Sequence, residues 1–376
     1  MKTIRIFAFP SHVSKDRVGG VDFFRIIQPA KHLNGFEYNG YKFEVELFDP
    51  KITGEITKPD KILNYWVDVF KRNDILFFNY TTDPWGFAPM GAVARHFNRT
   101  MVLEMDDNLW DVQKDNPVYS AYSKGSEGLK NFTAICNEVD YITTTNLYLK
   151  HVINHNTNKT HDKIGVLPNY VDLENIYTHR KKFKNDGHIQ LLHHGSTTHF
   201  VDLASEEFGK GIDMIMKRYP NVTLKTVGAF LPAYKQKWGL RYVNAFGHQD
   251  YYKWAKEVMP PYMDESDIMV VPLDENVYTR CKSNIKFSES SSAIIPGVWQ
   301  DIRQYHETVT HGKDGFLAKT AQEWYDAISF LIENPKEREK MGKEAFETTQ
   351  REWTIQKNVY KYAEFFIKVF DKSQDK

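Results

Sequence analysis

The feature that most constrains the fold is an alternation of short apolar runs with longer segments of helical periodicity. The short runs, such as Ile75–Phe78 and Ile268–Val271, are rich in β-branched and aromatic residues and contain no charged position. Strands that are apolar at every position are typical of parallel sheets, because helices cover both faces of such sheets. The alternation therefore predicts an α/β protein.

The alternation occurs twice, before and after a polar, basic segment at residues 177–187 that is typical of a linker. A chain of 376 residues also exceeds the usual size of one hydrophobic core. We therefore predict two doubly wound, Rossmann-like domains, at residues 1–180 and 181–350, facing a central cleft. In the first domain we expect strands at Ile4–Ala8, Val45–Phe48, Ile75–Phe78, Met101–Glu104, Tyr141–Thr144 and Ile164–Leu167. In the second we expect them at Ile189–His194, Thr223–Val227, Tyr242–Phe246, Ile268–Val271 and Ile294–Ile295.

The C-terminal tail is predicted to be helical from about Pro335. It carries more aromatic side chains than one exposed helix should present to solvent. We expect residues 351–376 to pack on the first domain and complete it; a helix lying on a membrane surface is the alternative. The aromatic residues are Trp353, Tyr360, Tyr362, Phe365, Phe366 and Phe370.

Charge and cysteine content argue against several classes of protein. Lysine plus arginine and aspartate plus glutamate both total 49. A chain with no net charge is not attracted as a whole to nucleic acid or to an anionic membrane, although a local basic patch is compatible with this balance. Cys136 and Cys281 are the only cysteines, which excludes a disulfide framework and a cysteine-rich zinc site. The first residues form a strand pattern instead of a signal peptide, and no apolar run approaches the roughly 20 residues that span a bilayer. We therefore expect a cytoplasmic protein.

Functional residues are expected in the loops after the strands, since ligands of doubly wound sheets bind beyond the carboxyl ends of the strands. The first such loop contains Ser11-His12 and ends in Gly19-Gly20 at a predicted helix start. Glycines there allow a phosphate to approach the helix amino terminus, and an ordinary turn is the alternative. Neither Gly-x-Gly-x-x-Gly nor Gly-x-x-x-x-Gly-Lys-Ser/Thr occurs, which disfavours dehydrogenases and P-loop nucleotidases.

The fourth predicted strand ends in a cluster of carboxylates that begins at Glu104 and includes Asp106, Asp107 and Asp111. Such a cluster can bind a divalent metal, accept hydrogen bonds from sugar hydroxyls, or cap the segment that follows. No second carboxylate cluster or histidine lies nearby in the sequence to complete a metal site. Asp83, after the third strand, either lines the same cleft or serves as a turn residue before a proline.

In the second domain, the first strand is followed by Gly195, Ser196 and His199 before a predicted helix. This loop favours hydrogen bonding to a pyrophosphate at the helix amino terminus. His193, His194 and His199 also suggest a metal site, but His193 lies within the strand pattern, where we expect it to pack, and the other two lack a third ligand.

The segment Arg280–Glu289 carries three cations, Arg280, Lys282 and Lys286, at a predicted helix start. Cations beside free backbone N–H groups would neutralise a nucleoside diphosphate as its negative charge grows on departure. Glu289 lies three residues after Lys286 and therefore on the same helix face. A solvated ion pair between these two side chains is the alternative interpretation.

Several motifs in this order resemble those of retaining GT-B glycosyltransferases of the family 4 type, especially a rhamnosyltransferase-like and phage-encoded branch. Residues 282–296 resemble that branch's Lys-Ser-x-x-Lys-Phe-x-Glu-Tyr-x-x-x-Gly-x-Pro. The other matching segments are Asp106-Asp107-Asn108-Leu109-Trp110, Leu167-Pro168-Asn169-Tyr170-Val171-Asp172, Gly195-Ser196-Thr197-Thr198-His199 and His311-Gly312-Lys313-Asp314-Gly315-Phe316-Leu317. The resemblance covers most of residues 100–320, and before that only Gly19-Gly20 and the stretch from Arg25 to Pro29.

The resemblance implies roles for individual side chains. Glu289 would bind the ribose hydroxyls of a nucleotide-sugar donor, Lys282 or Lys286 would meet its diphosphate, and Gly19 and Gly20 would approach the phosphates from the other domain. The remaining donor-binding residues would be Gly195, Ser196, His199, Arg280, Ser283 and Asn284, and the catalytic group would be Glu289, Lys282, Lys286, Asp106 and Asp107.

Three positions depart from the family pattern. Cys281 stands where the family has a glutamate that touches the transferred sugar, and Ile294 stands near the position of its glycine. The family's arginine and lysine pair for the diphosphate is missing after Gly195, although Lys210 is a candidate for the lysine.

We therefore predict retaining transfer of a sugar from a nucleoside-diphosphate sugar to an acceptor hydroxyl, with no required metal or cofactor and with domain closure excluding water. The acceptor is a glycan or a lipid-linked sugar, with peripheral membrane contact compatible with the latter. One alternative is glucosylation of hydroxymethylated bases in DNA, as in phage enzymes, and another is a non-catalytic module that binds sugar nucleotides. The candidate DNA contacts are Arg180, Lys181, Lys182, Lys184, Tyr234, Lys235, Lys237, Trp238 and Arg241.

Overall fold

The computed structural model describes residues 1–10, 17–50, 59–184, 186–196 and 199–374. The chain forms two compact units. Unit 1 comprises Met1–Tyr170, Cys281–Ser283 and Ile355–Lys376, and unit 2 comprises Val171–Arg280 and Asn284–Thr354. The first segment of unit 1 ends before the polar segment at 177–187, because Val171 already pairs with unit 2, where its N–H donates to the carbonyl of Trp353 at 2.9 Å. The loop residues Ser11 and His12 lie outside the described residues.

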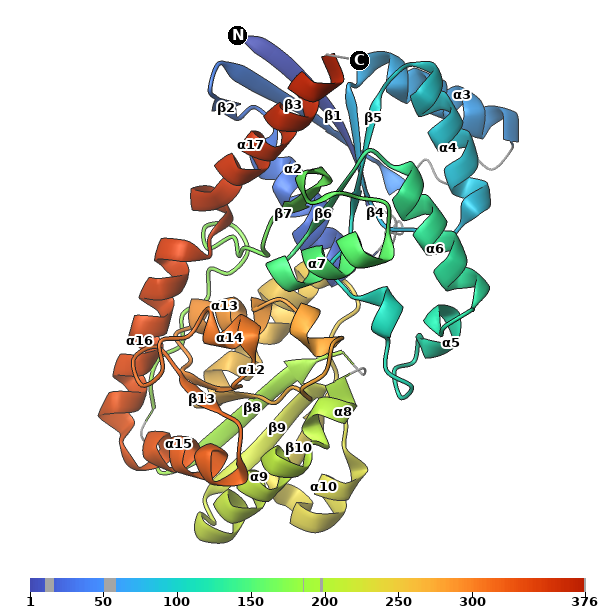
Figure 1. Ribbon diagram of the computed structural model, residues 1–376. Helices are drawn as coiled ribbons and strands as arrows, with labels where there is room; N and C mark the ends of the chain where they lie inside the picture. The colour runs from blue at the N-terminus through green and yellow to red at the C-terminus, as the bar shows by residue number, and fades with distance from the viewer. Residues whose placement is uncertain (11–16, 51–58, 185, 197–198, 375–376) are drawn as a thin grey trace. The chain divides into compact units, whose positions relative to one another are not determined.

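Among the described residues, unit 1 contains a seven-stranded sheet in the order β2-β3-β1-β4-β5-β6-β7 (Figure 1). Its strands are β1 (Lys2–Phe9), β2 (Glu37–Tyr38), β3 (Tyr41–Leu47), β4 (Ile75–Asn79), β5 (Thr100–Glu104), β6 (Tyr141–Thr144) and β7 (Ile164–Val166). Only β2 and β3 pair antiparallel, and the other neighbours pair parallel. Every residue of β4, β5 and β6 is buried, which explains why these segments are mostly apolar, with polar residues at some strand ends. The strand order reverses between β1 and β4, so the loops after these strands adjoin the position where such sheets bind ligands.

The helices of unit 1 are α1 (Gly20–Asp22), α2 (Gln28–Leu33), α3 (Pro59–Arg72), α4 (Pro84–His96), α5 (Tyr119–Tyr122), α6 (Glu127–Glu138), α7 (Leu147–Asn156) and α17 (Ile355–Gln374). The aromatic tail packs on the sheet of this unit. The ring of Phe366 on α17 lies 5.2 Å from that of Phe77 on β4, and Phe370 lies 6.3 Å from Tyr41 on β3. The apolar face of α17 is therefore covered by its own sheet.

A buried arginine joins the helix after β1 to two other segments of unit 1. Arg25 lies in a π-helical turn, Phe23–Ile27, between α1 and α2. Its Nε is 2.7 Å from Oε1 of Glu104 at the end of β5, and neither side chain is exposed. Its Nη1 donates to the carbonyl of Leu167 at 2.6 Å and to Oδ1 of Asn169 at 2.7 Å. Thr143 on β6 donates to the second oxygen of Glu104, so both oxygens of this carboxylate have partners.

Replacement of Arg25 by methionine is expected to lower the free energy of unfolding by about 3–5 kcal/mol, because Glu104 is left as an unpaired buried carboxylate. Arg72→Met is the matched control, since Arg72 pairs with Glu46 at 2.5 Å on the surface. The free energy of unfolding of that variant should fall by less than about 1 kcal/mol, because the ion pair is exposed to solvent. Urea unfolding of both variants checks the difference, and equal losses would contradict the role assigned to the buried pair.

Unit 2 contains, among its described residues, a six-stranded sheet in the order β10-β9-β8-β11-β12-β13. Its strands are β8 (Ile189–Gly195), β9 (Val222–Gly228), β10 (Tyr242–Ala245), β11 (Ile268–Val271), β12 (Gly297–Gln300) and β13 (Phe316–Ala318). All neighbouring strands pair parallel, and the order reverses between β8 and β11, as in the Rossmann fold. The predicted α/β fold with two Rossmann-like domains is confirmed.

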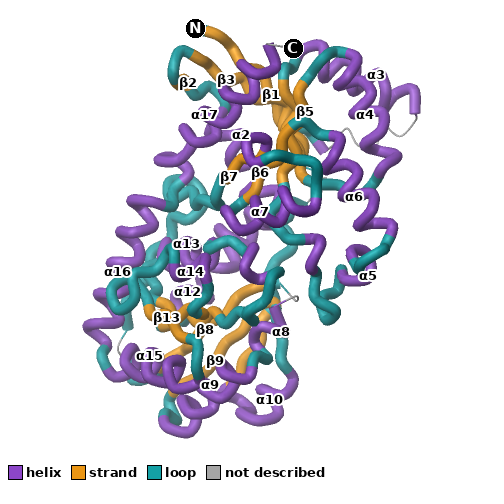
Figure 2. Tube along the Cα trace, in the orientation of Figure 1, coloured by secondary structure: helices purple, strands orange, loops and turns teal. Residues whose placement is uncertain are grey.

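The helices of unit 2 are α8 (Phe200–Leu203), α9 (Glu206–Arg218), α10 (Pro232–Trp238), α11 (Tyr251–Lys253), α12 (Met259–Glu265), α13 (Ile285–Ser292), α14 (Arg303–His306), α15 (Ala321–Glu333) and α16 (Pro335–Glu352). Figure 2 shows the strands of each unit gathered into a sheet with helices packed around it. The core of unit 2 lies between β8, β9, β11 and the helices α9 and α15, where Phe208 and Trp324 pack edge to face.

The predicted strand at Ile294–Ile295 is wrong, because these residues follow the end of helix α13 at Ser292 and the strand β12 begins at Gly297. The N–H of Ile294 donates to the carbonyl of Ser291 and that of Ile295 to Ser290, which is the Schellman pattern of a helix end. This pattern requires a left-handed residue, and Ile294 has φ 65°. The sequence motif has a glycine near this point, and the structure shows why: a left-handed backbone is usually supplied by glycine.

Candidate functional site

In unit 2 the candidate residues gather where β8 and β11 end. Gly195 is the last residue of β8 and pairs with Gly228, the last residue of β9. A Cβ atom on Gly228, which has φ 87°, would lie 2.0 Å from the carbonyl oxygen of Gly195. The two strands therefore approach too closely at this end for any side chain at Gly228.

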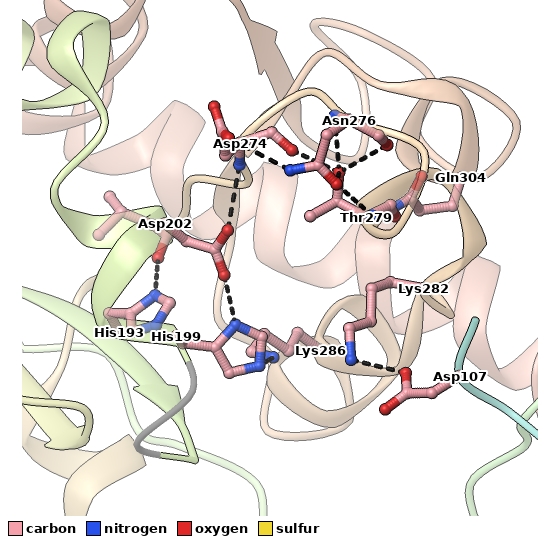
Figure 3. A network of polar contacts seen from close by, with 11 residues as sticks. Asp107, His193, His199, Asp202, Asp274, Asn276, Thr279, Lys282, Lys286 and Gln304 are labelled. Carbon is pink, nitrogen blue, oxygen red and sulfur yellow. Dashed lines mark hydrogen bonds and ion pairs between the residues drawn. The ribbon is translucent and has the colours of Figure 1, made fainter. Parts of the chain in front are cut away.

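His199 lies against Gly195 and links an aspartate to a lysine (Figure 3). Its Nδ1 is 2.7 Å from Oδ2 of Asp202, and its Nε2 is 3.0 Å from Nζ of Lys286. A lysine ammonium can only donate, so Nε2 is the acceptor and the ring proton is on Nδ1, which donates to Asp202. A Cβ atom on Gly195 would lie 2.6 Å from Cδ2 of His199, so the absence of a side chain at Gly195 leaves room for this ring.

Lys286 is in the first turn of α13, whose amino terminus has no side-chain cap. The preceding Asn284 is buried, and its amide donates to Oγ1 of Thr308 at 3.1 Å. A helix amino terminus whose N-cap side chain bonds elsewhere, together with a lysine in the first turn, suits an anion such as phosphate. The structure thus brings together His199 and Lys286, two of the predicted donor-site residues.

Glu289, one turn later on α13, is buried and held by two tyrosines. Its Oε1 accepts hydrogen bonds from Tyr177, at 3.1 Å, and from Tyr251, and the two hydroxyls are 2.6 Å apart. Its Oε2 is 3.9 Å from Nε2 of His194. Burial raises the pKa of Glu289, which hydrogen bonds from Tyr251 and the charge of Lys286 oppose. The alternative of a solvated ion pair with Lys286 is therefore wrong, because Glu289 is only 4% exposed.

Tyr177 and Tyr251 were not expected at the site. Tyr177 lies at the start of the polar segment, and Tyr251 begins the short helix α11. Neither belongs to a recognisable motif, so only the fold could bring them to Glu289.

The other two histidines of the cluster are buried and neutral. His193 is fully buried and its Nδ1 is 3.0 Å from the carbonyl of Val270, as expected for a packed residue. Burial lowers the pKa of His193 to about 3, and it also lowers the pKa of His194 well below its usual value. Within the part of the chain that the structure describes, no three histidine, cysteine or acidic side chains are arranged to hold a metal ion.

Three further candidates of unit 2, Arg280, Ser196 and Lys210, each contact a different neighbouring residue. Arg280 pairs with Glu275 at 3.0 Å and is partly exposed. Ser196 is exposed, and its carbonyl accepts the N–H of His199 at 3.0 Å. Lys210 pairs with Glu206 at 2.6 Å on the surface of α9, which does not support its predicted role as the diphosphate lysine.

In unit 1, residues Cys281–Ser283 pack beside the carboxylate cluster. Lys282 Nζ is 2.6 Å from Oδ1 of Asp107. Asn146 donates to the carbonyl of Cys281 at 2.7 Å, and Asn169 donates to Oγ of Ser283 at 3.0 Å. Lys282 therefore has a carboxylate partner in unit 1, whereas Lys286 has an imidazole partner in unit 2.

The carboxylate cluster divides into residues with different tasks. Asn108, not an aspartate, caps the 3-10 turn Leu109–Asp111 by accepting the N–H of Trp110 at 3.2 Å. Asp106 has a buried Oδ1 without a hydrogen-bond partner among the described residues. Burial and the neighbouring Asp107 raise the pKa of Asp106 to about 7, against the opposing charges of Arg25 and Lys282. Asp106 is thus the carboxyl of this cluster that can hold or release a proton near neutral pH.

The remaining candidates in unit 1 are at the ends of β1 and β4. Gly19 precedes α1, and among the described residues a Cβ atom there would meet Oδ2 of Asp22 at 3.6 Å, an ordinary contact distance. Gly20 is the first residue of α1. Asp83 accepts the N–H groups of Trp85 and Gly86 and caps α4, which agrees with its interpretation as a turn residue before a proline.

The predicted DNA-contacting patch is wrong for several of its members. Tyr234 and Trp238 are buried in the core of unit 2. Lys181 is buried and pairs with Asp267 at 3.1 Å. Arg241 donates to the carbonyls of Met216 and Tyr219. These side chains serve packing and backbone contacts, so no aromatic platform for an extruded base is formed by them.

Comparison with known proteins agrees with this architecture. Residues 190–334 match the family model described as "Glycosyl transferases group 1". No curated protein sequence matches the chain.

Solved structures of glycosyltransferase fold are similar over nearly the whole chain. One is Alr3699/HepE of Anabaena in complex with UDP-glucose, with 14% identity, a TM-score of 0.64, and coverage of 97% of this chain and 100% of that one. Another is sucrose-phosphate synthase from Thermosynechococcus elongatus, with 12% identity, a TM-score of 0.64, and coverage of 99% and 100%. A glycosyltransferase from Rickettsia africae has 13% identity, a TM-score of 0.62, and coverage of 99% and 98%. At these identities the likeness concerns the fold.

None of the helices in the described ranges combines the length and the apolar character needed to cross a membrane.

The raised pKa of Asp106 predicts a pH-dependent effect of Asp106→Asn on stability. The folded state keeps a proton on Asp106 up to about pH 7, whereas the unfolded chain releases it at about pH 4. The wild type therefore loses stability from this group as the pH rises between these values, and the asparagine variant does not. The difference between the melting temperatures of the variant and the wild type should therefore shift in favour of the variant from pH 4.5 to pH 7.5. Melting temperatures that change in parallel over this range would contradict the prediction.

Proposed function

We propose that the protein is a glycosyltransferase that moves a sugar from a nucleoside-diphosphate sugar to an acceptor hydroxyl, with retention and without a required metal or cofactor. The observation that carries the proposal is the position of Lys286 in the first turn of α13, whose N-cap residue makes no side-chain capping bond. This turn lies near the point where the strand order of the unit 2 sheet reverses, and Glu289 lies on the same helix. The family match over residues 190–334 supports it, since it spans both residues. Retention rests on the motif resemblance.

In this proposal the diphosphate binds at the start of α13. The N–H groups of the first turn donate to phosphate oxygens, and Lys286 supplies a full positive charge. Gly195, the last residue of β8, and Ser196, which follows it, contribute backbone N–H groups at the same edge of the sheet. These groups stabilise the leaving diphosphate because its charge grows as the bond to the sugar breaks.

Glu289 is proposed to accept hydrogen bonds from ribose hydroxyls through Oε2, because Oε1 already accepts from the two tyrosines. A carboxylate whose other oxygen is held in place loses little freedom when a ligand binds. UDP is the first nucleotide to test, since the Anabaena structures contain UDP and UDP-glucose.

The acceptor side is proposed to lie in unit 1. Asp106 and Asp107 are carboxylates that can accept hydrogen bonds from acceptor hydroxyls, and Lys282 fixes Asp107. Gly19 and Gly20 are proposed to leave space for phosphates at the start of α1. A glycan or lipid-linked sugar is the proposed acceptor, and a cytoplasmic location is part of the same proposal.

A second candidate function is a module that binds sugar nucleotides without transferring the sugar. Cys281, which occupies the position of the family's sugar-binding glutamate, is buried, and burial raises the pKa of its thiol to about 12. A neutral thiol cannot replace a carboxylate as an acceptor for sugar hydroxyls. This candidate predicts donor binding with neither hydrolysis nor transfer.

Thermal shift with UDP and UDP-sugars tests the donor site first. A ligand at about 100 times its dissociation constant should stabilise the wild type by roughly 2.7 kcal/mol. Transfer or donor hydrolysis is then measured for Lys286→Ala, Glu289→Gln, Glu289→Ala and Lys282→Ala, all of which should lose about 10²-fold or more in kcat/KM.

Lys343→Ala is the matched control, because Lys343 pairs with Glu339 on the surface of α16. It should retain both binding and turnover. Wild-type turnover in folded Glu289→Ala or Lys282→Ala protein would refute the assignment. Donor binding by a wild type that is inactive with all acceptors and in hydrolysis would favour the non-catalytic module.

A further inference from the structure

The three cations of Arg280–Glu289 differ in the side chains that they contact. Arg280 pairs with the carboxylate of Glu275, and Lys282 pairs with that of Asp107. Lys286 instead donates to a ring nitrogen of His199. The imidazole is an uncharged acceptor, so this hydrogen bond orients the Lys286 ammonium without cancelling its charge, and the carboxylate of Glu289 on the same helix also interacts electrostatically with Lys286.

We infer that Asp202 and His199 are positioning residues that hold the Lys286 ammonium ready for a diphosphate. The inference rests on the proposed function and explains how the site supplies a charge in place of the arginine and lysine pair that is missing after Gly195. Asp202 and His199 would then act through Lys286 and not on the sugar.

Asp202 determines which nitrogen of His199 carries the proton. One of its oxygens accepts Nδ1–H of His199 at 2.7 Å, and the other accepts the backbone N–H of Asp274 at 3.1 Å (Figure 3). Both groups donate a hydrogen bond to the buried Asp202 carboxylate. The arrangement therefore favours the tautomer in which His199 carries its proton on Nδ1 and Nε2 is unprotonated. The lone pair of Nε2 accepts from Lys286.

The surroundings of the ring maintain this arrangement. His199 is packed against Gly195, where a Cβ atom would lie 2.6 Å from its Cδ2. His193, whose ring centre lies 6.0 Å away, is neutral because burial lowers its pKa, so it adds no competing positive charge beside Lys286. Glu289 is the nearby carboxyl on α13, and its Oε1 is occupied by the tyrosines.

Asp202→Asn tests the inference with almost no change in shape. In this variant the side-chain amide oxygen can accept the N–H of Asp274, and the side-chain amide nitrogen then donates to Nδ1 of His199. The ring proton must move to Nε2, which then points an N–H at the Lys286 ammonium. Nitrogen-15 NMR of the histidine rings should report protonated Nδ1 in the wild type and protonated Nε2 in the variant.

Binding of UDP and of inorganic pyrophosphate is measured by calorimetry on the same proteins. Asp202→Asn and His199→Phe should each weaken both probes about tenfold, which is about 1.4 kcal/mol. Lys286→Ala should weaken them at least as much, and adding Asp202→Asn to Lys286→Ala should have little further effect, because the aspartate acts through the lysine. Asp213→Asn is the matched control, since Asp213 pairs with Lys237 at the surface of unit 2 and should leave binding unchanged.

Unchanged UDP and pyrophosphate affinity in folded Asp202→Asn protein, or additive losses in the double variant, would overturn the positioning role while leaving the proposed function intact. An unaltered tautomer in Asp202→Asn would overturn it as well. Absence of UDP, other nucleotide and pyrophosphate binding by the wild type would overturn both the inference and the proposed function, even where the NMR spectra show the expected tautomer.

Discussion

Parallel strand pairing is the constraint on which the rest of this structure depends. Each parallel neighbour requires a crossover, so the loops after the strands collect at one edge of each sheet. In unit 2, β8 lies between β9 and β11. The chain passes from β8 to β9 on one side and from β11 to β12 on the other, so the loops after β8 and β11 diverge where the two strands meet. His199 and Asp202, which follow β8, meet the backbone of Asp274, which follows β11, at this point. The close pairing of Gly195 with Gly228 leaves the strand ends bare, which makes room for the histidine ring.

Buried charge is handled differently in the two units. In unit 1, Arg25 and Glu104 are fully buried, and each also has uncharged hydrogen-bond partners, so the desolvation of the pair is compensated. Asp106 lies nearby with one oxygen lacking a partner among the described residues, and its pKa is correspondingly raised to about 7. In unit 2, the buried Glu289 accepts hydrogen bonds from two tyrosine hydroxyls and lies near a neutral histidine, while the charge of Lys286 on the same helix also acts on it. A carboxylate held in this way can still exchange a partner for a ligand hydroxyl.

The lysines of residues 282–286 illustrate why a cationic motif is not one functional unit. In sequence, Lys282 and Lys286 are equivalent candidates for a diphosphate. In the structure, Lys282 belongs to unit 1 and meets Asp107, while Lys286 belongs to unit 2 and meets His199. The carboxylate of Asp107 forms an ion pair with Lys282, whereas the ring of His199 orients Lys286 as an uncharged acceptor. The partner, and not the residue type, distinguishes their roles.

The sequence by itself determined the two parallel α/β units, most of their strands, and the loops in which charged residues gather, because apolar periodicity and strand-to-helix order are local properties of the chain. The short strands β2, β12 and β13 were not predicted. The sequence also proposed Lys286, Glu289 and His199 as candidates, because they follow strands or begin a helix. It failed at Ile294, where a helix end imposes a left-handed backbone on a β-branched residue that local propensity assigns to a strand. Only the tertiary structure decided that Tyr177 and Tyr251 hold Glu289, that Asp202 fixes His199, and that Tyr234 and Trp238 are core residues. Tyr177 and Tyr251 come to Glu289 from distant positions in the chain, whereas His199 and Asp202 are only three residues apart. In each case the packing of the folded chain decides which side chains are buried and which atoms meet, and no local sequence pattern encodes that packing.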